Sequence, residues 1–185
     1  PSLKYMPSTC KSPQQMTGAI IKTYYAQKMG IDPNDIVVVA VMPCIAKKYE
    51  SALPSEETYG IRDVDYVITT RELAKMFKEG SVDLRHVAEE EFDTPLGQST
   101  GAGVIFGGTG GVLEAALRTV YEKATGKTLE DVNFTAVRGL NGMREAQVDV
   151  AGRMVRVAAV AGLGNARKVL EKIESGEEKY DIIEI

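Results

Sequence analysis

The first element along the chain is indicated by a capping pattern followed by an apolar stripe. Ser12 supplies an N-cap, Pro13 takes the first helical position, and Gln15 stands three residues after the cap, which together form a capping box with a preset φ. Apolar residues then recur at helical spacing, at Met16, Ala19, Ile20, Thr23 and Tyr24. The pattern predicts a helix that begins at Pro13 and ends before Gly30.

Two apolar runs in the first half of the chain predict strands. Residues 36–41 form a continuous β-branched run, which is typical of a strand buried on both faces of a parallel sheet. Residues 64–68 form a second strand, and Thr69 can then cap a helix with Glu72 at the third position. Residues 81–100 carry a run of acidic side chains with little periodicity, so we expect a solvated loop there.

The second half continues the alternation of strands and helices. Residues 101–111 are rich in glycine and lead into an amphipathic helix of about four turns over residues 112–124. A strand follows at residues 133–138, and then a hairpin with strands at 146–150 and 154–160 around Ala151-Gly152-Arg153. A helix at 164–176 and a last strand at 180–185 complete the chain. This order predicts an α/β fold, with a largely parallel sheet flanked by helices and one antiparallel hairpin.

Composition narrows the class of protein. A chain of 185 residues with 44% hydrophobic and 26% charged residues suits one domain or two small lobes. Its 22 basic and 26 acidic residues give a net charge of −4, which argues against nucleic acid and anionic membranes as partners. The longest strongly apolar run is too short to cross a bilayer, and no signal-peptide pattern opens the chain. We therefore expect no membrane insertion and a cytoplasmic protein.

The two ends bear on whether the chain is complete. The first residue is Pro1 rather than methionine, and residues 180–185 predict a strand that runs to the last residue. A processed N-terminus and a C-terminal edge strand would explain both features. Our expectation is that residues 1–185 are a central fragment, truncated at both ends.

Cys44 is the first candidate for chemistry. It follows Pro43 at the carboxyl end of the predicted strand 36–41, where open α/β sheets place ligands. Lys47 and Lys48 come shortly after it, and a nearby ammonium group favours a thiolate. For an isolated cysteine, a buried thiol that acts as a small hydrophobe is the more frequent arrangement. With two cysteines, no CxxC spacing and a single histidine, the chain holds no self-contained zinc site.

The glycine-rich stretch 107–111 opens a helix, so its N–H groups and the helix dipole could hold an anion. The spacing fits neither the dinucleotide-binding fingerprint nor the P-loop. Two other interpretations are close backbone packing and a glycine surface that lets a bulky cofactor approach.

Six segments together resemble the catalytic domain of iron-only, or [FeFe], hydrogenases, in the family's order and across nearly the whole chain. They are residues 12–15, 42–48, 69–73, 99–103, 106–118 and 137–142. The resemblance implies an enzyme that interconverts H₂ with protons and electrons. Its cofactor would be the H-cluster, a [4Fe-4S] cubane joined through a cysteine to a di-iron unit that carries CO, CN⁻ and a bridging dithiolate.

The resemblance also implies roles for individual residues. Cys44 would be one of the four cubane thiolates, and Lys47 would donate a hydrogen bond to a cyanide. Ser8 matches the family's proton-relay serine, and Cys10 has no assigned role. Four other matched residues would surround the di-iron unit, namely Met42, Pro13, Phe106 and Gly107. Ser12 and Gln14 would lie near its diatomic ligands.

The family's other cysteine motifs are missing from the chain. A Cys-Cys-Pro motif should precede Pro1 and a Cys-x-x-x-Cys motif should follow Ile185. A single thiolate cannot hold a cubane that needs four. We therefore expect an apo, inactive piece that works only with the remainder of the hydrogenase chain, and with ferredoxin or another electron carrier.

Two other functional classes stay open on the sequence. One is a non-catalytic iron–sulfur cluster-binding or assembly protein of the hydrogenase-like family. The other is a generic anion-binding module built on residues 107–111. Retention of Lys47, Gln14 and Phe106 beside Cys44 favours catalysis, because a protein that holds only a cubane has little use for contacts to a di-iron unit.

Overall fold

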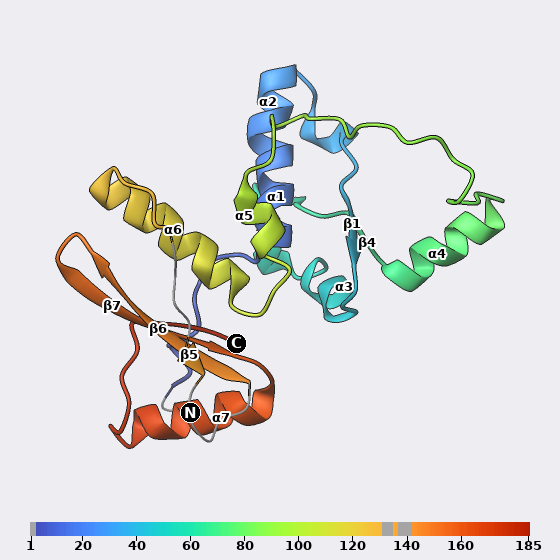
Figure 1. The fold of residues 1–185 in the computed structure, drawn as a ribbon. Helices are drawn as coiled ribbons and strands as arrows, with labels where there is room; N and C mark the ends of the chain where they lie inside the picture. Colours follow the sequence, from blue (N-terminus) through green and yellow to red (C-terminus); the bar gives the residue numbers. More distant parts are fainter. Residues whose placement is uncertain (1–2, 131–134, 137–141) are drawn as a thin grey trace. The chain divides into compact units, whose positions relative to one another are not determined.

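The computed structural model describes residues 3–130, 135–136 and 142–185. The chain divides into two compact units, residues 1–97 and residues 98–185, and each is described by itself. Helices and strands alternate in both units (Figure 1), so the predicted α/β class is confirmed. Parallel pairing occurs between β1 (Val39–Met42) and β4 (Tyr66–Thr69) and between β7 (Arg153–Val160) and β8 (Ile182–Glu184). The other paired strands are antiparallel.

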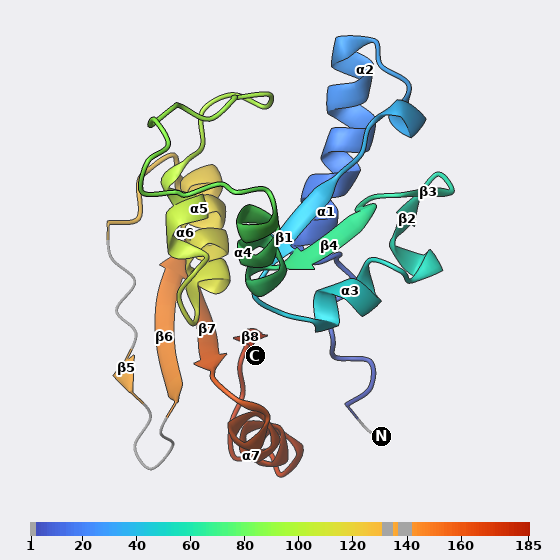
Figure 2. The same cartoon turned by 90° about the vertical axis from the view of Figure 1, so that its right-hand side faces the viewer.

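The first unit has a small parallel sheet with helices following its strands (Figure 2). β1 pairs with β4, with Val39 opposite Tyr66, and β2 pairs with β3 in a separate antiparallel ribbon. The helices are α1 (Pro13–Ile20), α2 (Ala26–Met29), α3 (Ala46–Glu50) and α4 (Thr70–Glu79), and the strands are β1 (Val39–Met42), β2 (Glu57–Thr58), β3 (Ile61–Arg62) and β4 (Tyr66–Thr69). A π-helical turn (Ile21–Tyr25) joins α1 to α2, and 3₁₀ turns lie at Pro33–Asp35 and Pro54–Glu56.

The predicted start and end of the first helix are confirmed. The Ser12 side chain accepts a hydrogen bond from the Gln15 N–H at 3.4 Å, and Pro13 occupies the first turn. Gly30 ends the helical stretch in the left-handed conformation, at φ 67°, which glycine adopts without a Cβ penalty.

The apolar stripe of this helix is not its buried face. Met16 and Tyr24 are 42% and 57% exposed, and the buried positions of the helix are instead Gln15, Gly18, Lys22 and Ala26. Gly18 explains the difference, because a Cβ there would stand 2.3 Å from the carbonyl oxygen of Asp63. The helix approaches the 63–65 segment too closely for a large apolar side chain at position 18.

Two ion pairs fix this close approach. Lys22 is buried and donates to the Asp65 carboxylate at 2.8 Å. Lys11 reaches the buried Asp63 carboxylate at 2.5 Å and the Glu56 carbonyl oxygen at 2.7 Å. Buried charges in proteins are almost always paired in this way.

β1 also differs from its prediction. The run at 36–41 suggested burial on both faces, but Val39 and Val41 are exposed while Ala40 and Met42 are partly covered. Alternate residues of a strand point to opposite faces. One face of β1 is therefore open among the described residues.

α4 begins at the capping box predicted from Thr69 and Glu72. Thr69 Oγ1 accepts from the Glu72 N–H at 3.1 Å, and a Glu72 carboxylate oxygen accepts from the Thr69 N–H at 2.7 Å. Lys48 donates to both Glu72 carboxylate oxygens, at 2.6 and 2.7 Å. These contacts lower the pKa of Glu72 to about 2, with the Lys48 hydrogen bond as the largest cause.

Acidification is expected to loosen the start of α4. Because the pKa of Glu72 is lower in the folded chain, its contribution is full above the ordinary glutamate value of 4.5 and is lost as the pH falls towards about 2. Asp83 also has a pKa lowered to about 2, so a global measurement of acid stability would report both carboxyl groups. Hydrogen-exchange protection at the Thr69 and Glu72 amides reports the start of α4 alone. In Glu72→Gln, the protection factors of these amides should no longer fall between pH 4.5 and about 2. Protection factors that fall with acid in this variant as they do in the unsubstituted chain would contradict the assignment.

The long connection after α4 is a loop, as predicted. Residues 81–100 contain neither helix nor strand and are exposed throughout.

The second unit is a sheet with one long helix on each face, and a short helix precedes the first of these along the chain. Its sheet order is β5-β6-β7-β8. The elements are α5 (Gly101–Ile105), α6 (Gly111–Thr125), β5 (Thr135–Ala136), β6 (Met143–Val150), β7 (Arg153–Val160), α7 (Leu163–Glu174) and β8 (Ile182–Glu184). The predicted hairpin is confirmed, and Ala151 and Gly152 both have positive φ, as a type I′ loop requires. The predicted strand at 133–138 is described only at 135–136, and the motif at 137–142 lies outside the described residues except for Gly142.

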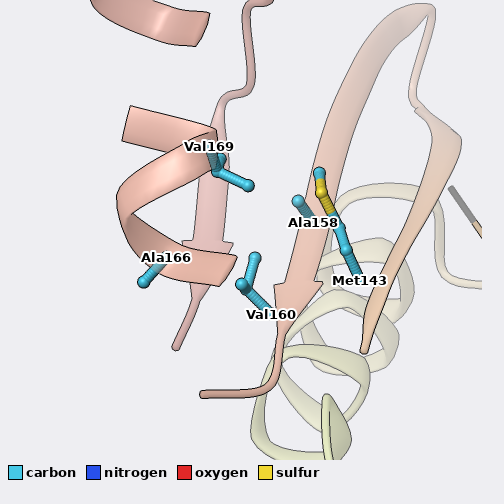
Figure 3. Close-up of a cluster of buried hydrophobic side chains, with 5 residues drawn as sticks. All are labelled: Met143, Ala158, Val160, Ala166 and Val169. Carbon is cyan, nitrogen blue, oxygen red and sulfur yellow. The ribbon is translucent and has the colours of Figure 1, made fainter. Parts of the chain in front are cut away.

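The two helices cover opposite faces of the hairpin. Leu113 and Leu117 of α6 pack with Val157 and its neighbours on one face. Ala166 and Val169 of α7 pack on the other face (Figure 3), where the strands contribute Met143, Ala158 and Val160. Because both faces are covered, β7 is buried at four consecutive residues, 157–160.

Candidate functional site

Cys44 lies at the carboxyl end of β1, as the sequence predicts. The strand ends at Met42, Pro43 follows, and the Cys44 carbonyl oxygen accepts from the Lys47 N–H at 3.0 Å where the chain turns into α3. The thiol is free and Cys44 is exposed. The alternative of a buried cysteine acting as a small hydrophobe is therefore wrong.

The residues at the start of α1 form the second part of the candidate site. Ser12 and Gln14 are partly buried, and Pro13 is exposed at the first helical position. Both polar atoms of the Gln14 amide are buried, and neither has a hydrogen-bond partner among the residues that the structure describes. A buried amide without partners is unfavourable by about 1–3 kcal/mol. An unmet donor and acceptor of this kind fits a residue that contacts a bound group.

The structure joins Ser12 to Lys47 through a residue that the sequence analysis missed. Ser12 Oγ donates to one carboxylate oxygen of Glu50, and Lys47 Nζ contacts the other at 2.5 Å. Partial burial acts to raise the pKa of Glu50, but the hydrogen bonds from Lys47 and Ser12 and the charge of Lys47 together hold it below its ordinary value. Glu50 is therefore a carboxylate that links α3 to the N-cap of α1.

Some of this arrangement was visible in the sequence. Lys47 and Glu50 stand three residues apart, which is the spacing of neighbours on a helix surface. The contact with Ser12 crosses 38 residues, and no local pattern predicts it. The lysines near Cys44 are both paired with carboxylates, Lys47 with Glu50 and Lys48 with Glu72.

Two further predicted residues lie in the same unit. Ser8 is exposed, and its hydroxyl accepts from the Cys10 N–H at 3.1 Å. Met42 is partly buried at the last position of β1. Cys10 carries the second free, exposed thiol of the chain.

Phe106 and Gly107 belong to the second unit. Phe106 caps the end of α5 and is 39% exposed, and a Cβ on Gly107 would meet no atom within 4 Å. Their predicted proximity to Cys44 stays a prediction. Open space at Gly107 fits the proposal that a bulky group approaches the backbone there.

The start of α6 already holds an anion of the chain itself. One Glu184 carboxylate oxygen accepts from the Gly110 N–H at 3.0 Å and the other from the Leu113 N–H at 2.7 Å. A carboxylate at a helix N-terminus satisfies free N–H groups and complements the dipole. The glycine stretch is also closely packed, since a Cβ on Gly111 would stand 1.7 Å from the Ile105 carbonyl oxygen. These contacts favour the close-packing interpretation over an anion-binding module.

The donor set decides which part of an iron cluster the chain can hold. Within the described residues no group of three or more His, Cys, Asp and Glu side chains is placed to hold a metal. The exposed Cys44, Lys47 and the Gln14 amide, which has no partner among the described residues, fit residues that each supply one contact to an H-cluster. The two cysteines of the chain cannot supply the four thiolates of its cubane.

The comparisons with known proteins point to one family. The chain matches the family model described as "Iron only hydrogenase large subunit, C-terminal domain" over residues 1–185. It is 55% identical to the NADP-reducing hydrogenase subunit HndD of Solidesulfovibrio fructosivorans, covering 96% of this chain and 30% of that protein. It is 48% identical to the periplasmic [Fe] hydrogenase large subunit of Nitratidesulfovibrio vulgaris, covering 96% of this chain and 42% of that protein.

Solved structures agree with this match. A variant of the [FeFe]-hydrogenase HydA1 from Chlamydomonas reinhardtii superposes with a TM-score of 0.80 at 39% identity, covering 96% of this chain and 52% of that one. The chain thus spans about half, or less, of the length of these proteins. On the sequence and structural matches together, the chain belongs to the family of the C-terminal domain of iron-only hydrogenase large subunits.

Proposed function

We propose that residues 1–185 form the central part of the catalytic domain of an iron-only hydrogenase. The complete polypeptide would interconvert H₂ with protons and electrons, and the H-cluster would supply the redox chemistry when bound. The support is the family match together with the accessible Cys44 thiol at the end of β1. That thiol is the observation that carries the proposal, because a cubane ligand must be reachable from outside the sheet.

The family resemblance supplies a proposed role for each predicted site residue. Cys44 would be one cubane ligand. Lys47 would donate a hydrogen bond to an anionic cyanide, and Gln14 would offer a donor and an acceptor that have no partner among the described residues. By the family resemblance, the Ser8 hydroxyl would pass protons. The same resemblance assigns Met42, Pro13, Phe106 and Gly107 to the wall of the di-iron unit, with Ser12 near its diatomic ligands.

The partners follow from the reaction. The substrates are H₂ and protons, electrons are exchanged with ferredoxin or another carrier, and the missing thiolates come from the remainder of the hydrogenase chain. No nucleic acid is involved. Within the described residues, no helix has the length and apolar character that crossing a membrane requires.

We place the protein in the cytoplasm. The relative from N. vulgaris carries the word periplasmic in its name. Cell fractionation with immunoblotting tests the location, and recovery from the periplasmic fraction would contradict it.

The second candidate function is iron–sulfur cluster binding without catalysis. The cytosolic Fe-S cluster assembly factor narfl of Xenopus tropicalis is 32% identical over 99% of this chain and 39% of that protein. We favour the hydrogenase because its relatives reach higher identity, and because Lys47 and Gln14 suit contacts to a di-iron unit that a cubane carrier does not need.

The first experiment compares residues 1–185 with the complete polypeptide after anaerobic reconstitution. The complete polypeptide is expected to hold iron and acid-labile sulfide in the proportions of an H-cluster and to evolve H₂ from a reduced one-electron dye. Residues 1–185 alone are expected to do neither, because they lack the remaining thiolates. A full complement of iron with turnover in residues 1–185 would refute the fragment proposal. A complete polypeptide that holds only a cubane and evolves no H₂ would favour the assembly function.

A further inference from the structure

The Glu50 carboxylate contacts two side chains that come from separate segments of this unit. One carboxylate oxygen accepts from Ser12 Oγ and the other from Lys47 Nζ at 2.5 Å. Both Ser12 and Lys47 are residues of the proposed di-iron site. The side chains of Lys47 and Glu50 are each 24% exposed, so water screens this pair less than the more exposed Lys48–Glu72 pair.

The two contacts tie separate segments together. Ser12 is the N-cap of α1, and the next turn carries Pro13 and Gln14. Lys47 lies on α3, one turn after Cys44. A carboxylate that holds both ends fixes the position of the ammonium group relative to the start of α1, and therefore relative to the Gln14 amide.

The chemistry leaves Lys47 able to bind a ligand as well. An ammonium group has three N–H donors, so one contact with Glu50 leaves two. A lysine side chain has many rotamers, and a fixed partner lowers the entropy that is lost when it binds a second acceptor. The same carboxylate orients the Ser12 hydroxyl, whose hydrogen points to Glu50. One lone pair of this oxygen accepts from the Gln15 N–H, which leaves the second available.

We propose that Glu50 is a positioning residue of the di-iron site, which holds Lys47 and Ser12 in the geometry that receives the diatomic ligands. This inference rests on the proposed function. Glu50 does not touch the cluster in this proposal, and it acts through the two side chains that do.

The test uses the complete polypeptide, loaded anaerobically with the H-cluster, and reads the cyanide stretching bands in the infrared. Glu50→Ala removes both contacts, and Glu50→Gln keeps the size of the side chain but removes the charge. Lys47→Met removes the proposed donor itself. Glu72→Gln is the matched control. It removes a carboxylate that also pairs with a lysine, but the partners of Glu72 are Lys48 and the Thr69 N–H, neither of which belongs to the proposed site.

Lys47→Met is expected to shift a cyanide band. Glu50→Ala is expected to shift the same band in the same direction by less and to broaden it, with Glu50→Gln between Glu50→Ala and the unsubstituted protein and Glu72→Gln unchanged. A shift in Lys47→Met with no change in either Glu50 variant would overturn the positioning role and leave the proposed function standing. No shift in Lys47→Met would overturn both Lys47 as a cyanide donor and the inference that depends on it.

A measurement without cluster separates positioning from folding. In the cluster-free complete polypeptide, ¹³C NMR titration of the Glu50 carboxyl should give a pKa below the ordinary value, and this pKa should rise in Lys47→Met and in Ser12→Ala. If Glu50→Ala does not fold, as judged by circular dichroism, Glu50→Gln carries the infrared test. An unchanged Glu50 pKa in both partner variants would show that the contacts are not made in solution, and would also overturn the proposal.

Discussion

Replacing Cys44 with alanine in the complete polypeptide is expected to abolish binding of the cubane. A cubane needs four thiolates, and one of them cannot be replaced by a methyl group. Iron and acid-labile sulfide per chain, with the visible absorption of the cluster, should fall at least about tenfold, since even outer contacts of metal ligands are worth about 10–100-fold. H₂ evolution should fall with them.

Cys10→Ala is the matched control for Cys44→Ala. Both cysteines are exposed and free. Cys10 donates a hydrogen bond to Ser8 through its backbone N–H rather than its sulfur. Cys10→Ala is expected to retain the cluster. Loss of the cluster in Cys10→Ala and its retention in Cys44→Ala would reverse the assignment of the ligand.

Protein stability must stay constant for that comparison to be clear. An exposed thiol leaves no cavity when it is truncated, and substitutions at such positions change the free energy of unfolding by about 0.5 kcal/mol or less. Urea unfolding of the cluster-free variants measures this. A large loss of stability in Cys44→Ala would mean that the thiol packs inside the protein.

Local sequence signals predicted the ends of several elements correctly. The caps at Ser12 and Thr69 start helices where expected, and Ala151-Gly152 closes the hairpin. These signals succeed because each is a contact between residues at most three or four apart, or a backbone conformation of one residue. The short helices α3 and α5 were missed because five residues carry too little periodicity to be recognised.

Burial was harder to predict than secondary structure. The apolar stripe of α1 faces outward among the described residues, while Gln15, Gly18 and Lys22 are buried. Periodicity identifies an apolar face but not the surface that covers it. The actual contact of α1 depends on the Asp63 backbone and on Asp65, more than 40 residues along the chain.

The candidate site shows the same division. The family resemblance supplied Cys44, Lys47 and Gln14, whose roles at a bound group stay predictions. The contact of Glu50 with Ser12 and the contacts of Glu184 had no such signal, because these partners lie 38 and more than 70 residues away. Carboxylates that act over such separations can be recognised only once the fold is known.

Gly111→Ala is expected to destabilise the second unit by about 3 kcal/mol or more, the upper part of the range for overpacking. The added Cβ would stand 1.7 Å from the Ile105 carbonyl oxygen and 3.2 Å from the Phe106 Cα, so the α5–α6 turn must move. The helix propensity that alanine gains over glycine, about 1 kcal/mol or less, is too small to offset this. Urea unfolding followed by circular dichroism measures the loss.

Gly107→Ala is the matched comparison within the same glycine stretch, because a Cβ there would meet no atom within 4 Å. Its unfolding free energy should stay within about 0.5 kcal/mol of the unsubstituted chain. If Gly107 lies against the di-iron unit, the same variant should load less of that unit in the complete polypeptide, while the cubane content is unchanged. The two glycines would then have different roles. Gly111 would allow close packing within the chain, and Gly107 would allow close approach of the cofactor. Equal destabilisation by both substitutions, or full loading of Gly107→Ala, would contradict that separation.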